Sequence, residues 1–322
     1  MTAFRFGVQA YAAETASEWK DLARAAEGHG YSCLSVADHY FGPGAAMTAA
    51  SHPAQNLAAI PAMTMAAAVT DTIMIGSRVM CIDYHQPVVL AKSLSTIDLL
   101  SDGRLEAGLG AGWITSEYEA MGIPMDRAGV RIDRLVEYVA LTKAFFAGAD
   151  LDQQGAHVSV RDMAAIPAAV QEGGPKIMIG GGSPRVLRTA GELADIVSIN
   201  FDNSAGKIGA HGIGSGSPAG TADKVGWIQE GAGDRFDDVE LEIGAYFTTV
   251  TDDGAGTREK MGAAFGMSGE QLAAYPHALV GSVDEICETL QQRREDYGIS
   301  YITVGAATMA DFAPVVERLA GT

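Results

Sequence analysis

The chain has 322 residues, of which 48% are hydrophobic, so it can bury the core of one large domain or of two small ones. Its formal net charge of −18 opposes binding to nucleic acid or to an anionic membrane surface. Its three cysteines are widely spaced and form no CxxC pair, which argues against a disulfide framework or a cysteine zinc site and favours a reducing cytoplasm. No apolar run approaches the roughly 20 residues that span a bilayer, and residues 1–11 have the pattern of a first strand rather than a signal peptide.

Short β-rich runs alternate with amphipathic helical stretches along the chain. The expected strands cover residues 4–8, 33–37, 73–82, 105–109, 176–180, 196–200, 240–250 and 299–304. The expected helices cover residues 17–29, 58–69, 87–100, 127–147, 184–193, 221–229, 257–265, 283–297 and 309–319. Strands without polar alternation, such as residues 176–180, suit a parallel sheet that is covered on both faces.

Eight strands that alternate with helices predict an α/β fold, the (β/α)8 TIM barrel. We expect a single domain over residues 1–322, with insertions near 148–175 and 201–220; the second is rich in Gly and Ser and has the composition of a mobile lid or loop. A doubly wound open sheet is the alternative. The GLGAGW run does not follow the first strand, which weakens a dinucleotide-binding interpretation.

Chemistry in such barrels lies at the carboxyl ends of the strands, so each expected strand end yields candidates. These are Gln9 after the first strand, Asp38 and His39 after the second, and Met80, Cys81 and Ile82 after the third. Ala111, Gly112 and Trp113 follow the fourth strand, Gly180, Gly181, Gly182 and Ser183 follow the fifth, and Asn200 follows the sixth.

Gly108, Gly110 and Gly112 alternate at the end of the fourth strand, beside Trp113. Such a pattern leaves one side of the strand without side chains, and a flat ring can lie there with Trp113 as a wall and Glu117 at the rim. The alternative is close packing between the strand and a neighbouring element.

Gly180–Gly182 connect a buried strand to a helix that begins with Ser183 as N-cap and Pro184 in its first turn. Free amides before a helix N-terminus form an anion cradle, which favours a phosphate group. An ordinary strand–helix turn is the alternative. Arg185 and Arg188 in the helix are expected either to add positive charge or to lie on the surface.

The pair Asp38-His39 suits acid–base chemistry, with His39 as the proton donor or acceptor and Asp38 orienting it. Cys81 has no neighbour that would activate it and is expected to be a small buried residue, and His85 is expected to be structural. The chain contains no HExxH, GxSxG, P-loop or first-strand HxH motif, so zinc protease, hydrolase, NTPase and amidohydrolase functions lose support and no metal site is expected.

Taken together, these motifs resemble the bacterial luciferase-like monooxygenase superfamily, and most closely its coenzyme F420-dependent oxidoreductases of mycobacteria and related actinobacteria. The resemblance is densest over residues 87–134. It rests on Asp98-Leu99-Leu100-Ser101, Gly103-Arg104, Gly110–Trp113, Glu117, Gly122-Ile123-Pro124 and Arg131 to Leu135.

The resemblance implies a deazaflavin or flavin ring across the barrel mouth, with a non-proline cis peptide near residues 80–82 behind it. It further implies a phosphate on Gly181 and Gly182, His39 near the reactive edge of the ring, and a homodimer. Trp113 and Ser116 stand where relatives that oxidise glucose-6-phosphate carry Glu and Asn, which puts sugar-phosphate oxidation in doubt.

We therefore expect an F420-dependent enzyme that transfers a hydride between C5 of the deazaflavin and a small, largely apolar organic substrate. His39 and Asp38 are the expected catalytic residues; Trp113, braced by Glu117, forms a wall of the substrate pocket that Asn200 also lines. The expected cofactor contacts are Gln9, Met80, Cys81, Ile82, Ala111, Gly112, Gly180, Gly181, Gly182 and Ser183. An FMN-dependent monooxygenase and a non-catalytic F420-binding protein are the alternatives.

Overall fold

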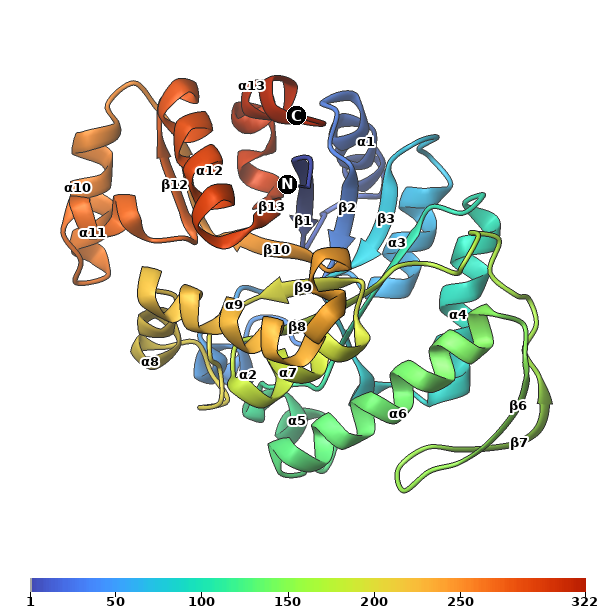
Figure 1. Ribbon diagram of the computed structural model, residues 1–322. Coiled ribbons are helices and arrows are strands. Elements are labelled where there is room, and N and C mark those ends of the chain that lie inside the picture. Colours follow the sequence, from blue (N-terminus) through green and yellow to red (C-terminus); the bar gives the residue numbers. More distant parts are fainter. Residues whose placement is uncertain (1) are drawn as a thin grey trace.

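A closed barrel of eight parallel strands forms the centre of the computed structural model, which describes residues 2–322 (Figure 1). The strands follow one another around the barrel in chain order: β1 (Arg5–Ala10), β2 (Cys33–Val36), β3 (Met74–Ser77), β5 (Leu105–Gly110), β8 (Ile177–Gly181), β9 (Ile196–Ile199), β10 (Glu240–Ala245) and β13 (Ile299–Gly305). Pairing of β3 with β5 and of β1 with β13 closes the ring. The predicted (β/α)8 barrel is therefore confirmed, and the open-sheet alternative is wrong.

Helices surround the barrel and cover its outer face (Figure 1). The longer ones are α1 (Ala16–Gly28), α3 (Ala59–Ala67), α4 (Pro87–Leu100), α6 (Ala128–Phe146), α7 (Pro184–Leu193), α9 (Pro218–Ala232), α12 (Val283–Tyr297) and α13 (Met309–Leu319). Local sequence sets their ends: Ser282 and Glu285 form a reciprocal capping box at the start of α12, and Gly298 ends that helix in the left-handed conformation. Among residues 2–322, no helix combines the length and hydropathy that crossing a membrane requires.

Three excursions leave the regular barrel. The first predicted insertion contains the antiparallel hairpin of β6 (Asp150–Gln154) and β7 (Ser159–Ala164). The second contains α8 (Ala210–Ser215) and the beginning of α9. The third was not predicted: it runs from β11 (Phe247–Val250) through α10 (Gly254–Ala264) and α11 (Gly269–Ala274) to β12 (Ala278–Gly281).

The expected strand over residues 240–250 is in fact two strands with different partners. Strand β10 belongs to the barrel, whereas β11 pairs in parallel with β12 outside it. Residues 243–250 contain no proline or charged residue that would mark a break, so the sequence pattern did not reveal the change of partner at Tyr246.

The expected strand over residues 73–82 is also interrupted. Strand β3 ends at Ser77, and the chain resumes pairing with β5 only in the short strand β4 (Met80–Cys81), before the 3-10 turn η1 (Ile82–Tyr84). The peptide bond between Arg78 and Val79 is cis. A cis bond of the kind predicted near residues 80–82 therefore exists after the third strand, but it lies just before those residues, between Arg78 and Val79.

Candidate functional site

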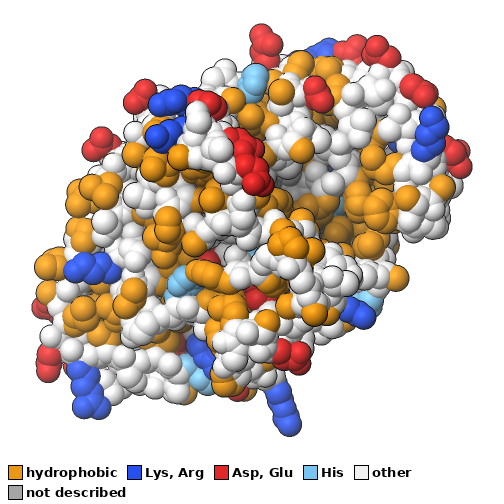
Figure 2. Space-filling view, turned by 180° about the vertical axis from the view of Figure 1, so that it is seen from behind, with side chains coloured by type: hydrophobic (Ala, Val, Ile, Leu, Met, Phe, Trp, Pro, Cys, Tyr) orange, Lys and Arg blue, Asp and Glu red, His pale blue; other side chains and the backbone are white. Residues whose placement is uncertain are grey.

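A cavity of about 710 Å³ opens at the carboxyl ends of the barrel strands. A hollow bordered by hydrophobic side chains is visible on the face of the molecule shown in Figure 2. Twelve of the predicted site residues line this cavity: Gln9, Asp38, His39, Cys81, Ala111, Gly112, Trp113, Gly180, Gly181, Gly182, Ser183 and Asn200. Among residues 2–322, no group of three or more His, Cys, Asp or Glu side chains is arranged to hold a metal ion.

Three predicted site residues do not line the cavity. Met80 and Ile82 are buried in the hydrophobic core rather than exposed in the cavity wall. Glu117 is also fully buried and lies behind the cavity wall rather than in it. Strand alternation explains the difference between Met80, Cys81 and Ile82: Cys81 is the residue of this segment that faces the cavity.

His39 is held by Glu117. Its Nδ1 lies 2.8 Å from Glu117 Oε2, and the same carboxylate accepts hydrogen bonds from the Tyr40 amide at 2.6 Å and the Tyr84 hydroxyl at 3.0 Å. Glu117 occupies the first turn of α5 (Thr115–Met121), where the helix dipole stabilises a negative charge. Because a carboxylate only accepts, His39 Nδ1 is the donor, which leaves Nε2 free for a ligand.

Asp38 does not orient His39, which corrects the predicted pairing. Its Oδ2 accepts hydrogen bonds from the Cys81 amide at 3.0 Å and from His85 Nε2 at 2.7 Å, so it ties the end of β2 to the end of β4. Its other oxygen, Oδ1, is buried and has no partner among the described residues. Glu117 likewise does not brace Trp113 through a hydrogen bond; the side chains that it holds are those of His39 and Tyr84.

The alternating glycines make room for the protein itself. A Cβ on Gly108 would lie 1.9 Å from the Ser77 carbonyl oxygen, and a Cβ on Gly110 would lie 2.6 Å from Val79 Cγ2. The displaced segment between β3 and β4 therefore fills the space beside β5, which is the close-packing alternative. Val79 lines the cavity in its place, so the cavity floor at this point is an apolar side chain rather than bare backbone.

The glycine turn after β8 is also closely packed. A Cβ on Gly182 would lie 2.0 Å from the Phe201 carbonyl oxygen, and one on Gly181 would lie 2.4 Å from Val186 Cγ1. Ser183 occupies the N-cap position of α7, but its side chain makes no capping hydrogen bond. The amino end of this ten-residue helix faces the cavity, because Gly180–Ser183 and Val186 line it.

Three arginines that the sequence analysis had not assigned to a site line the cavity: Arg78, Arg127 and Arg131. Arg131 Nε donates to the Ala111 carbonyl at 3.0 Å, and its Nη2 lies 3.3 Å from the Gly112 carbonyl, so it holds the loop after β5 in place. Arg185 and Arg188 are paired on the surface with Asp133 and Glu230 and do not line the cavity.

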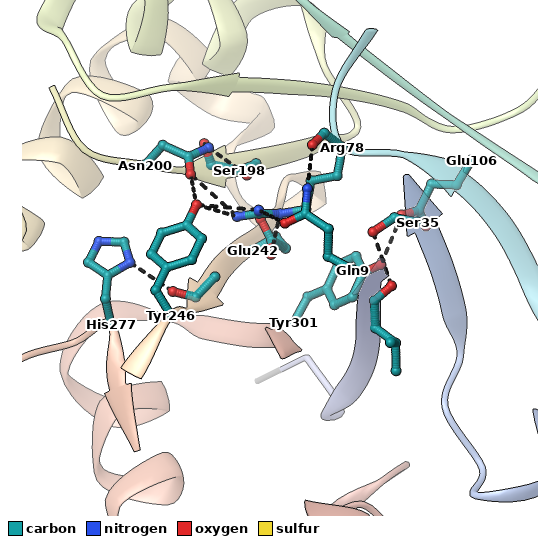
Figure 3. A network of polar contacts seen from close by, with 12 residues as sticks. Gln9, Ser35, Arg78, Glu106, Ser198, Asn200, Glu242, Tyr246, His277 and Tyr301 are labelled. Carbon is teal, nitrogen blue, oxygen red and sulfur yellow. Dashed lines mark hydrogen bonds and ion pairs between the residues drawn. The ribbon is translucent and has the colours of Figure 1, made fainter. Parts of the chain in front are cut away.

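A buried polar network forms the other side of the cavity (Figure 3). Arg78 pairs with Glu242 at 2.9 Å and donates to Gln9 Oε1 at 2.9 Å, while Gln9 Nε2 donates to the Arg78 carbonyl at 2.9 Å. The Tyr246 hydroxyl accepts from both Arg78 Nη atoms at 3.3 Å and donates to Asn200 Oδ1. Sequence reasoning missed Arg78 and Tyr246 because each lies inside a segment expected to be an uninterrupted strand.

His52 is a second histidine in the cavity wall that the sequence did not single out. Its ring centroid lies 4.3 Å from that of His39, and both rings line the cavity. Burial, with the neighbouring His39, lowers the pKa of His52 to about 4, so it is neutral at neutral pH. Its Nδ1 lies 2.8 Å from the Pro53 carbonyl, which assigns the proton to Nδ1.

The chain is a (β/α)8 barrel protein with a paired histidine and carboxylate beside a cavity at the carboxyl ends of its strands, where active sites of such barrels lie. The family model of the luciferase-like monooxygenases matches residues 1–253, which is most of the chain. The chain is therefore a member of the luciferase-like monooxygenase family.

Curated relatives match part of the chain. An uncharacterised protein of Mycobacterium tuberculosis is 30% identical over 185 residues, which cover 54% of this chain and 64% of the relative. The F420-dependent glucose-6-phosphate dehydrogenase of Nakamurella multipartita is 30% identical over 207 residues, which cover 63% of this chain and 57% of that enzyme. The chain thus spans less than two thirds of the length of these relatives.

Solved structures share the whole fold at low sequence identity. An F420-dependent secondary alcohol dehydrogenase in complex with an F420-acetone adduct has a TM-score of 0.78 at 16% identity and covers 99% of both chains. The F420-dependent tetrahydromethanopterin reductase of Methanopyrus kandleri has a TM-score of 0.75 at 17% identity, again over 99% of both chains. A long-chain alkane monooxygenase has a TM-score of 0.74 at 15% identity and covers 99% of this chain and 91% of that one.

Proposed function

We propose that this protein is an F420-dependent oxidoreductase that transfers a hydride between C5 of the deazaflavin and a small organic substrate. The observation that carries the proposal is His39 at the cavity wall, fixed by the buried Glu117 with its Nε2 free. The F420-dependent glucose-6-phosphate dehydrogenase among the relatives supports the choice of cofactor.

The residues of the cavity fit such a cofactor. The amides of Gly180–Ser183 at the amino end of α7 suit a phosphate group, and Arg127 and Arg131 supply positive charge. Val79 offers an apolar contact for a ring, and the unpartnered Oδ1 of Asp38 supplies a buried acceptor at the same cavity. Cys81, Ala111 and Gly112 are further proposed contacts. When bound, the deazaflavin supplies or receives the hydride.

His39 is the proposed acid–base residue. Its Nε2 takes a proton from the substrate, or returns one to it, as the hydride moves. The Glu117 carboxylate, 2.8 Å from Nδ1, holds the ring in one tautomer and faces the imidazolium that forms. Trp113, whose ring lies 6.2 Å from that of His39 in an edge-on arrangement, forms a wall of the substrate pocket. The aromatic wall excludes water from the reacting groups.

The test begins with cofactor binding. Purified protein is titrated with F420 and separately with FMN, and fluorescence quenching is measured. Tight binding of F420 with weak or no binding of FMN is the expected result. Tight FMN binding without F420 binding would replace the proposal with an FMN-dependent monooxygenase.

Activity is tested next with a panel of alcohols, enones and nitro compounds in both directions of F420 reduction. His39→Ala is expected to lower turnover at least about 100-fold while F420 binding stays within about threefold. Unchanged turnover in this variant contradicts the acid–base role of His39. Absence of any F420 redox change with every compound favours a non-catalytic binder.

A further inference from the structure

The cavity extends beyond the proposed cofactor contacts into a region that we call the aromatic arm. Its lining residues are Phe201, Ile213, Tyr246, Phe247 and Phe265. They belong to the segment after β9 and to the excursion after β10, and these two strands are neighbours in the barrel. His39 follows β2, which lies four strands away from β9 in the ring, so the arm and His39 face the cavity from opposite sides.

Tyr246 forms a fixed platform in this arm. Its hydroxyl is held by both Nη atoms of Arg78 at 3.3 Å and by Asn200 Oδ1. Its ring stacks on the fully buried ring of His277, with centroids 5.4 Å apart and an angle of 13° between the planes (Figure 3). The ring is thus restrained at its tip and on one face, yet 41% of the side chain remains exposed and lines the cavity.

Other aromatic rings flank the platform. The Phe201 ring lies 5.2 Å from that of Tyr246 at an angle of 51°, and the Phe265 ring lies 4.6 Å from that of Phe247 at 59°. Phe265 is itself 41% exposed. Tilted rings beside an open flat face provide the offset and edge-to-face contacts that aromatic ligands prefer.

The charge of the arm selects against anions. Arg78 is neutralised by Glu242 at 2.9 Å and is fully engaged by its neighbours. Asp202 also lines the cavity beside Phe201. Burial opposes ionisation of Asp202, but hydrogen bonds from Ser204 and the nearby His211 hold its pKa below the ordinary value, so this carboxylate is charged at neutral pH. An anionic ligand in the arm would meet this charge, and among residues 2–322 the only Lys or Arg side chains that line the cavity are Arg78, Arg127 and Arg131, of which the last two follow β5 rather than border the arm.

We propose that the aromatic arm binds an uncharged, planar aromatic ring of the substrate, stacked on Tyr246, and that the pocket thereby selects aromatic over aliphatic substrates. The inference rests on the proposed function only in that the bound molecule is the substrate of that reaction. A long aliphatic chain would fill the same volume, but it gains nothing from a flat ring that is held in one orientation. Tyr246 is therefore a specificity-determining residue.

The test measures binding of 2-naphthol and of its saturated analogue, decahydro-2-naphthol, to the full chain without cofactor by titration calorimetry. Tyr246→Leu is expected to weaken 2-naphthol binding about two- to tenfold and to change binding of the saturated analogue less than twofold. Tyr297→Leu is the matched control, because Tyr297 does not line the cavity and is expected to change neither affinity. Tyr246→Phe keeps the ring and is expected to keep the preference for the aromatic compound.

Phe265→Leu provides an independent variant if Tyr246→Leu does not fold. We expect this variant also to lose affinity for 2-naphthol but not for the saturated analogue. The proposal is overturned if these variants lose affinity equally for both compounds, or lose affinity for neither. Because no cofactor is present, this outcome is separate from the F420 titration. Failure of F420 to bind removes the proposed reaction but leaves the aromatic site. Failure of 2-naphthol to bind selectively removes the aromatic site but leaves the proposed reaction.

Discussion

His39 Nδ1 and Glu117 Oε2 lie 2.8 Å apart although the two residues are 78 positions apart in the chain. The contact joins the end of β2 to the first turn of α5, and the carboxylate is completely shielded from solvent. Two further donors, the Tyr40 amide and the Tyr84 hydroxyl, hold this carboxylate in place. The geometry makes Glu117 a positioning residue for the imidazole.

Glu117→Gln is expected to lower turnover about 10- to 100-fold, because an amide can present a donor where His39, Tyr40 and Tyr84 all require an acceptor. Steady-state kinetics with F420 measure the effect on turnover, and fluorescence titration measures the effect on cofactor binding. We expect kcat to fall, while the dissociation constant of the cofactor changes less than about threefold. Glu119→Gln, an exposed neighbour on the same helix, is the control. Equal effects of the two substitutions would contradict the positioning role.

Gly110→Ala is expected to destabilise the protein by about 1–3 kcal/mol, because the new methyl group would overlap Val79 Cγ2 at 2.6 Å. It is also expected to weaken cofactor binding, since Val79 forms part of the cavity floor. Urea unfolding and cofactor titration measure both effects. Gly305→Ala provides a matched comparison at the carboxyl end of β13, where a Cβ meets nothing within 4 Å and stability should hold.

Arg131→Lys is expected to weaken cofactor binding about tenfold, because a lysine cannot reproduce the fork that holds the carbonyls of Ala111 and Gly112. These residues lie on the loop that lines the cavity after β5. Fluorescence titration measures the change, and Arg161→Lys on the exposed β6–β7 hairpin is the control. A dissociation constant that is unaltered in Arg131→Lys shows that this loop does not contribute to the cofactor site.

His277 is expected to make the protein sensitive to acid. Burial lowers its pKa to about 3, and the charges of Lys224, Arg78 and Arg293 act in the same direction, although the Gly244 carbonyl opposes them. The unfolded chain binds a proton at His277 near pH 6.5 and the folded chain only near pH 3. Its contribution to stability is therefore complete above pH 6.5 and is lost as the pH falls toward 3.

Urea unfolding at pH 6.5 and 5.0 tests this sensitivity. Between these values the wild-type protein is expected to lose up to about 2 kcal/mol more unfolding free energy than His277→Asn. His157→Asn, at an exposed position, should follow the wild type. If the His277→Asn curve also runs parallel to the wild type, another group determines the acid sensitivity.

Much of the barrel could be predicted because its signals are local. The turn after β8, the helix start at Pro184 and the apolar strand Ile177–Gly181 follow from the glycine run, the fixed φ of proline and the lack of polar alternation. The same logic placed Gln9, Asp38, His39 and Asn200 at strand ends, and all four line one cavity. The interruptions at Arg78–Val79 and at Tyr246 had no such signal, because no proline marks either of them.

The sequence by itself determined the alternation of strands and helices, and with it the barrel and the edge at which its polar residues gather, because periodicity and turn chemistry act between near neighbours. Only the tertiary structure decided that Glu117 rather than Asp38 holds His39, that Val79 fills the space beside Gly110, and that Arg78 fixes Tyr246. These contacts join distant segments, and they depend on which side chain reaches the barrel interior once the ring of strands has closed.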